Sequence, residues 1–208
     1  NERDLISMKQ QVVVIHGGNV FGTYEDFIAH LLIRKIDLDY FSSPGWKSCL
    51  GGALGEEYQV IVPQMPNKQN AKYNEWKIWF EKILPLLNRD IILVGHSLGG
   101  TFLVKYLAEN KMDKDIVATL LVAAPLTDEE SQKESLEDFL PPENISLLQD
   151  QSKEIFLYFS TDDAVVPFSN VADYEKKLPG VHTRKFSDRG HFNQDGFPEI
   201  VEDITSLA

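Results

Sequence analysis

The sequence contains only one cysteine, Cys49, among its 208 residues. A single thiol cannot form a disulfide within the chain, and it supplies only one of the ligands that a zinc ion needs. A chain of this length with 43% hydrophobic residues is long enough to be stabilised by a buried core instead. The low cysteine content is typical of a reducing compartment, and we expect a cytoplasmic protein.

Positive charge is also scarce. Lys and Arg total 20 against 32 Asp and Glu, so the net charge is −12. Such a surface repels the phosphates of nucleic acids and the headgroups of anionic membranes. The longest apolar stretch, residues 116–126, is interrupted by Thr119 and is shorter than the roughly 20 residues that cross a bilayer. We therefore expect no nucleic-acid partner and no membrane association.

The motifs that hold common cofactors are missing. No GxGxxG sequence follows the first apolar run, and no Walker lysine is present, so the sequence has no phosphate-binding loop. The histidines and carboxylates do not have the spacing of a zinc site. We expect a protein that needs neither a cofactor nor a metal ion.

Short apolar runs recur along the chain and predict the strands of a buried sheet. They cover residues 12–15, 58–62, 91–94, 117–122, 155–159 and 181–186. The first five barely alternate between apolar and polar residues, as parallel strands do when both faces are covered. Amphipathic segments between them predict helices at residues 23–35, 70–84, 98–110, 168–178 and 198–207. In the segment 70–84, the stripe of Trp76, Trp79 and Phe80 is expected to pack on the sheet.

Alternating strands and helices predict a doubly wound α/β fold in one domain, residues 1–208. We expect a compact, mostly parallel sheet of about six strands with helices on both faces. Segments 36–57 and 125–150 break the alternation. The first is predicted to be partly irregular and the second a polar excursion, and both are candidates for lids over an active site.

The strongest chemical signal is the sequence Gly-His-Ser-Leu-Gly-Gly at residues 95–100. It follows one apolar run and precedes a helical segment, which is the strand–turn–helix context of a nucleophile elbow. Side chains two residues before and after a serine on such a sharp turn would collide, and Gly95 and Gly99 remove them. Gly100 would let the helix approach the sheet. We interpret Ser97 as a nucleophile.

A serine hydroxyl needs a base, and the base needs a carboxylate that orients it. Of the five histidines, only His182 and His191 follow the strand after the elbow. His182 lies inside the last apolar run, whereas His191 follows it in a loop at the carboxyl edge of the sheet, where α/β active sites gather. We predict His191 as the base. Asp162 and Asp163 follow the fifth run at the same edge, and either could supply the carboxylate.

The motifs GHSLGG, DDAVVP and RGHF, in this order, resemble those of α/β-hydrolases with a Ser–Asp–His triad. The short chain and its tryptophan-bearing helix are most similar to the small serine hydrolases of the retinoblastoma-binding-protein-nine type. The resemblance extends over residues 12–204 and implies an α/β-hydrolase fold. It also implies Ser97 as nucleophile, His191 as base, and Asp163 as the acid, because Asp163 has the family's spacing to Pro167.

The same resemblance implies an oxyanion hole formed by backbone N–H groups of Leu98 and Gly18, with Asn19 replacing Gly18 if the loop is shifted by one residue. His16 and His96 are expected to have structural roles, with the ring of His16 tying its loop down. The long aromatic segment 36–57 departs from the shortest members of the family.

We predict a serine hydrolase that cleaves a carboxylic ester of a small molecule through an acyl-enzyme on Ser97. An amidase or peptidase would use the same triad, so the residues do not divide these activities. A third possibility is a binding protein on a hydrolase fold, with partner contacts on segments 36–57 or 125–150. The sequence identifies no protein partner.

Overall fold

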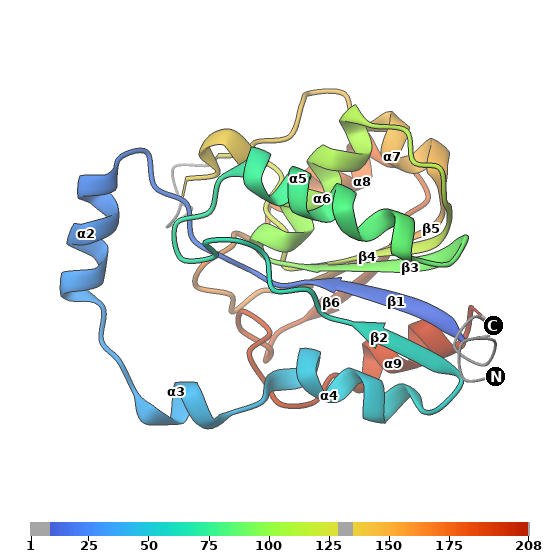
Figure 1. Ribbon diagram of the computed structural model, residues 1–208, viewed down its shortest axis with the longest axis horizontal. Helices are drawn as coiled ribbons and strands as arrows, with labels where there is room; N and C mark the ends of the chain where they lie inside the picture. Colours follow the sequence, from blue (N-terminus) through green and yellow to red (C-terminus); the bar gives the residue numbers. More distant parts are fainter. Residues whose placement is uncertain (1–8, 129–134, 208) are drawn as a thin grey trace.

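The apolar runs form one parallel sheet of six strands. The computed structural model describes residues 9–128 and 135–207, which include all of these strands. The strands are β1 (Gln10–Ile15), β2 (Tyr58–Ile61), β3 (Asp90–His96), β4 (Asp115–Val122), β5 (Ser152–Ser160) and β6 (His182–Phe186). They lie in the order β2-β1-β3-β4-β5-β6, and every neighbouring pair is parallel (Figure 1).

Strand β1 shows why the apolar runs do not alternate. Val13 and Ile15 belong to the core on one face of the sheet, and Val12 and Val14 belong to the core on the other. All four side chains are fully buried. Because both faces are covered, both sets of residues must be apolar.

Helices cover the two faces unequally, as Figure 1 shows. One face carries α5 (Tyr73–Ile83), α6 (Leu98–Glu109), α7 (Ser146–Gln151) and α8 (Asn170–Lys177), with the short 3₁₀ turns η1 (Leu84–Leu86) and η2 (Glu137–Phe139). The opposite face carries α4 (Gly45–Leu54) and α9 (Pro198–Thr205). The predicted parallel sheet with helices on both faces is confirmed.

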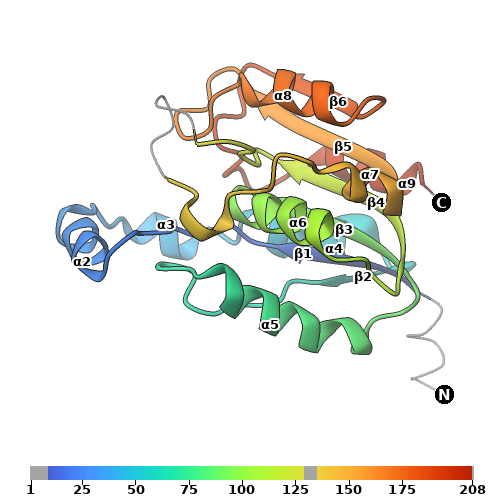
Figure 2. The ribbon, with the colours of Figure 1, turned by 90° about the horizontal axis from the view of Figure 1, so that it is seen from above.

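Two helices project from the sheet instead of packing on it. These are α2 (Tyr24–Ile33) and α3 (Leu38–Ser42), which extend to one side in Figures 1 and 2. The side chain of Thr23 caps α2 by accepting a hydrogen bond from the Asp26 N–H, as its sequence pattern indicates. No side chain of α2 is buried, and Leu32 is 82% exposed. The amphipathic pattern of residues 23–35 therefore predicted the helix, but not that it would extend away from the sheet.

Segment 36–57 is more regular than we expected. Its second half is α4, in which Trp46, Leu50 and Leu54 recur at four-residue spacing and are buried against the sheet. The indole N–H of Trp46 also donates to the carbonyl of Phe192 over 2.9 Å. Helix α4 is thus part of the core, while the lid role of this segment stays a prediction.

Segment 125–150 is only partly described, because residues 129–134 lie outside the described ranges. Leu136, Phe139 and Leu148 of this segment are buried in the core beside α5 and α6. These contacts anchor the described part of the excursion. Its role as a lid stays a prediction.

The tryptophan stripe on α5 was predicted wrongly in one position. Trp76 and Phe80 are fully buried, but Trp79 is 44% exposed because it lies one residue away from the buried face of the helix.

Within residues 9–128 and 135–207, no helix has both the length and the apolar character of a membrane span.

Candidate active site

Ser97 lies on the sharp turn between β3 and α6. Its φ is 53° and its ψ is −127°, a conformation that non-glycine residues rarely adopt. A Cβ at Gly95 would lie 2.4 Å from the Cα of Gly100, and one at Gly99 would lie 2.3 Å from the carbonyl oxygen of Ile15. These backbone collisions explain why glycine occupies both positions around the serine. The turn thus presents Ser97 at the carboxyl edge of the sheet.

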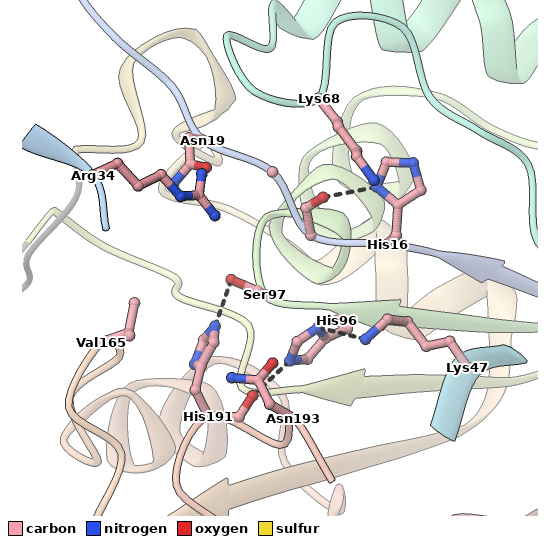
Figure 3. Close-up of a pocket in the computed structure, with 12 residues that line it drawn as sticks. His16, Asn19, Arg34, Lys47, Lys68, His96, Ser97, Val165, His191 and Asn193 are labelled. Carbon is pink, nitrogen blue, oxygen red and sulfur yellow. Dashed lines mark hydrogen bonds between the residues drawn. The ribbon is translucent and has the colours of Figure 1, made fainter. Parts of the chain in front are cut away.

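The structure brings Ser97, His191 and Asp163 into one hydrogen-bonded chain. His191 Nε2 lies 3.0 Å from Ser97 Oγ, and His191 Nδ1 lies 2.8 Å from Asp163 Oδ2 (Figure 3 shows the first contact). An ionised carboxylate only accepts hydrogen bonds, so Nδ1 carries the proton and Nε2 accepts from the serine hydroxyl. This is the arrangement in which a histidine removes the proton of a serine nucleophile.

Asp163 is held in a buried position. Its side chain is 1% exposed, and its Oδ1 accepts from the backbone N–H groups of Val165 and Val166 over 2.8 and 3.0 Å. The other oxygen therefore remains directed at His191. These contacts stabilise the charged carboxylate and fix the orientation of the imidazole.

Two backbone N–H groups beside Ser97 have no acceptor among the residues that the structure describes. They belong to Leu98, at the start of α6, and to Gly18. The N–H of Asn19 donates to the carbonyl of Lys68 over 2.8 Å, so this amide is already used. A Cβ at Gly18 would lie 2.6 Å from the same carbonyl, which excludes other residues there. The geometry favours Gly18 over Asn19 as the second donor.

Comparisons with known proteins identify the family of this chain. A family model described as serine hydrolase matches residues 42–206. The chain belongs to the serine hydrolase family. It is 25% identical to the serine hydrolase RBBP9 of Rattus norvegicus over 151 residues, which are 72% of this chain and 78% of the rat protein.

Solved structures show that this serine hydrolase has an α/β-hydrolase fold. The ydeN gene product of B. subtilis matches with a TM-score of 0.65 and 19% identity, over 96% of this chain and 98% of that chain. The esterase domain of a Rhodothermus marinus protein matches with a TM-score of 0.61 and 13% identity, over 96% and 86% of the two chains. At these identities the likeness concerns the fold alone.

In this serine hydrolase His16 ties two loops together. Its Nε2 accepts from the backbone N–H of Met65 over 2.9 Å, so its Nδ1 carries the proton and donates to the carbonyl of Gly17 over 2.7 Å. Burial lowers the pKa of His16, which keeps the ring neutral. The ring therefore holds the loop that contains Gly18 against the loop after β2.

His96 connects the elbow to the loop of His191. Its Nδ1 lies 3.2 Å from Nζ of Lys47 and its Nε2 lies 2.9 Å from the carbonyl oxygen of His191. Lys47 only donates, so the proton of the ring is on Nε2 and is donated to His191. Burial, assisted by the charge of Lys47, lowers the pKa of His96 well below its ordinary value. His96 therefore holds the backbone of His191, whose ring contacts Ser97.

Ser97 opens into a cavity of about 270 Å³ that sequence reasoning did not anticipate. Its wall includes three basic side chains: Arg34 at the end of α2, Lys47 on α4 and Lys68 in the loop after β2. In the view of Figure 3, Arg34 lies on one side of Ser97, and Lys47 and Lys68 lie on the other. No local motif marks these residues, because each comes from a different part of the chain.

A second, narrower cavity of about 20 Å³ also reaches Ser97. Apart from Ser97 and Ser135, the described residues of its wall are apolar or glycine: Gly18, Val20, Leu98, Pro125, Leu136, Val165 and Val166. Pro125, Ser135 and Leu136 come from segment 125–150. This segment thus borders the site at the point where a small apolar group would fit.

His182 and Cys49 lie outside the site around Ser97. His182 is exposed at the start of β6, and its Nε2 lies 2.7 Å from Oε2 of Glu154, near the start of β5. Cys49 is exposed on α4. Among the described residues, no group of three or more His, Cys, Asp or Glu side chains is arranged to bind a metal ion.

Proposed function

We propose that this serine hydrolase cleaves a carboxylic ester of a small molecule through an acyl-enzyme on Ser97. The observation that carries the proposal is the chain of hydrogen bonds from Asp163 through His191 to Ser97, with Ser97 at the wall of two cavities. The match to an esterase domain of Rhodothermus marinus is consistent with ester chemistry on this fold.

The first half of the reaction forms the acyl-enzyme. Ser97 Oγ attacks the ester carbonyl carbon as its proton passes to His191 Nε2, and the carbonyl becomes an oxyanion. The N–H groups of Leu98 and Gly18 donate to that oxyanion, while Asp163 stabilises the imidazolium. The C–O bond to the alcohol then breaks, and His191 gives its proton to the departing oxygen.

The second half releases the acid. A water molecule loses a proton to His191 as it attacks the acyl carbon, and the same two N–H groups stabilise the second oxyanion. The bond to Ser97 breaks and the serine regains its proton from His191. Water is consumed, an acid and an alcohol are produced, and the enzyme returns to its starting state.

Labelling with a fluorophosphonate probe tests whether Ser97 is an activated nucleophile. We expect the purified protein to be labelled, and the label to be lost in Ser97→Ala. Ser146→Ala is the matched control, because Ser146 is an exposed serine that lines neither cavity. Equal labelling of wild type and Ser97→Ala would contradict the proposal, and so would an unlabelled, folded wild type.

Substrate screening tests the ester assignment. We expect turnover of 4-nitrophenyl acetate and butyrate that falls at least about 10³-fold in Ser97→Ala, the scale of losing a serine nucleophile. Aminoacyl 4-nitroanilides are assayed in parallel. Faster Ser97-dependent cleavage of the anilides than of the esters would replace the esterase by an amidase or peptidase.

A further inference from the structure

We propose that the substrate carries an anionic group, a carboxylate or a phosphate, which Lys47 and Lys68 bind in the larger cavity beside Ser97. The inference deepens the proposed esterase function and rests on it. It names the substrate class: an ester with a short apolar group on one side of the scissile bond and an anion on the other.

The lining of the larger cavity is the first support. Arg34, Lys47 and Lys68 all border it, and no Asp or Glu is among the described residues that line it. The carboxylate nearest to the chemistry, Asp163, is buried behind His191 and does not border the cavity. Among residues 9–128 and 135–207, the side chains that a substrate meets in this space therefore include Lys47 and Lys68 but no carboxylate.

Lys47 is the second support, because its ammonium has no carboxylate partner in the part of the chain that the structure describes. It is half-buried, and its hydrogen bond is to the neutral ring of His96. Across residues 9–128 and 135–207, neither Lys47 nor Lys68 forms an ion pair with a carboxylate. Burying an unpaired ammonium costs free energy, and an anion in the cavity would offset that cost.

Repulsion between the basic groups of the cavity also favours a bound anion. Burial, and after it the positive charge of Lys68, lowers the pKa of Lys47 to about 8. The charges of Lys68 and Lys47 also contribute to the lowered pKa of His16. These cations are close enough to oppose one another. A bound carboxylate or phosphate would replace this repulsion with attraction.

Several cations elsewhere in the protein pair with carboxylates. Arg184 pairs with Asp203, Arg189 with Glu199 and Lys177 with Glu143. With a net charge of −12, the chain has carboxylates in excess. A cavity lined by basic groups in such a protein concentrates positive potential at one place. Ser97 lines this same cavity.

The shape of the site places the two parts of the substrate. Ser97 borders both cavities, and the smaller one is lined by Leu98, Leu136 and Val166 among others. A group of about methyl size fits there, while the anion extends into the larger cavity. The scissile carbonyl then lies between them, next to the N–H groups of Leu98 and Gly18.

Matched ester pairs measure the effect of the anion. In the first pair, 4-acetoxybenzoate is compared with its neutral methyl ester, and 4-acetoxyphenyl phosphate tests whether a phosphate replaces the carboxylate. In the second pair, monomethyl adipate is compared with dimethyl adipate, counted per ester group, which places the anion on the acyl side and a methyl group on the other. Each kcat/KM is divided by the rate of hydroxide-catalysed hydrolysis to remove differences in intrinsic reactivity.

We expect the wild type to prefer the anionic member of at least one pair by tenfold or more. Raising NaCl from 20 mM to 0.5 M should reduce that preference, because salt screens charge at an open site. Lys68→Gln should lower it at least fivefold. The matched control is Lys82→Gln, which removes the same charge from the exposed face of α5 outside the cavity and should leave both rates as in the wild type.

Three results would overturn the inference. The first is equal normalised rates within both pairs. The second is an anion preference that survives unchanged in Lys68→Gln and Lys47→Gln, and the third is an equal loss in Lys82→Gln. In each case, Ser97-dependent hydrolysis of the neutral esters would leave the proposed function intact. Failure of fluorophosphonate labelling would instead contradict the proposed function itself, and the inference with it.

Discussion

Asp162 and Asp163 are consecutive, but only Asp163 contacts the imidazole of His191. Asp163 Oδ2 lies 2.8 Å from His191 Nδ1. Asp162 Oδ1 instead accepts from the hydroxyl of Ser160 and, over 2.9 Å, from the N–H of Gly190. These hydrogen bonds lower the pKa of Asp162, with the one from Ser160 contributing most. The two carboxylates therefore hold the same loop, one through the ring and one through the backbone.

Asp163→Asn should lower the rate of acylation by as much as roughly 10⁴-fold, because an amide favours the wrong tautomer of His191 and cannot stabilise the imidazolium. Asp162→Asn should cost less than about tenfold, since the ring contact is intact. Single-turnover acylation with one activated ester compares the two variants. A larger loss in Asp162→Asn would reverse the assignment, and small equal losses would indicate that another carboxylate orients His191.

Leu136→Ala should shift acyl-chain preference towards longer esters. Leu136 is 2% exposed and lines the narrow cavity at Ser97, so its removal creates space where a short acyl group fits. We expect the ratio of kcat/KM for 4-nitrophenyl hexanoate over acetate to rise about tenfold. Leu140→Ala is the control, because Leu140 belongs to the same segment but is exposed and lines neither cavity.

An unchanged hexanoate-to-acetate ratio in an active, folded Leu136→Ala enzyme would show that the described part of segment 125–150 does not select the substrate. A rise of the same size in Leu140→Ala would attribute the effect to the segment as a whole. Circular dichroism of both variants checks that the fold is retained.

The preference for an anionic ester should decline as the pH rises through about 8. Lys47 has its pKa lowered to about 8 by burial and by Lys68, so its ammonium loses its proton there. The other groups that face it are His96, His16, Lys68 and the ring of Trp46. Both histidines have lowered pKa values and are already neutral in this range. Lys47→Gln should therefore remove the decline.

The measurement is the ratio of kcat/KM for 4-acetoxybenzoate over its methyl ester between pH 6.5 and 9. Changes in the triad affect both esters and cancel in the ratio. Stability gives a second readout. The unfolded chain binds a proton at Lys47 up to about pH 10, so unfolding free energy should rise with pH from about 8 to 10 in the wild type relative to Lys47→Gln. A flat ratio across this range would contradict the role of Lys47.

Two glycines with different surroundings provide a test of the elbow's packing. Gly99→Ala should destabilise the fold by more than about 3 kcal/mol, because its Cβ would lie 2.3 Å from the backbone oxygen of Ile15. Gly52→Ala should stabilise it by about 0.5–1 kcal/mol, since Gly52 lies within α4 with no atom in the way. Chemical denaturation compares both with the wild type. A Gly99→Ala protein of normal stability would contradict the close approach of α6 to β1.

The parallel sheet and the elbow were predictable because their signals are contiguous in the chain. A strand covered on both faces must be apolar throughout, as residues 12–15 are. A serine in a strained turn requires small neighbours at fixed offsets, and Gly95 and Gly99 stand there. Parallel strands also end at one edge, so residues that follow different strands were expected to meet.

Tertiary packing decided the features that no contiguous pattern encodes. Asp162 and Asp163 have the same chemistry, and only the resemblance, through the spacing to Pro167, implied Asp163. The turn after β5 is what places Asp163 and not Asp162 at the ring of His191. The amphipathic pattern of residues 23–35 predicted a helix, but a local signal does not specify what the helix packs against.

The basic cavity is the clearest case of a tertiary decision. Arg34, Lys47 and Lys68 are separated by 13 and 21 positions in the chain, and each looks like an ordinary surface cation in a sequence with 20 of them. They meet because α2, α4 and the loop after β2 all reach the same edge of the sheet. The sequence by itself determined a nucleophile elbow on a parallel sheet; only long-range packing decided which charges surround it, because a cavity is formed by segments that are neighbours in space and not in the chain.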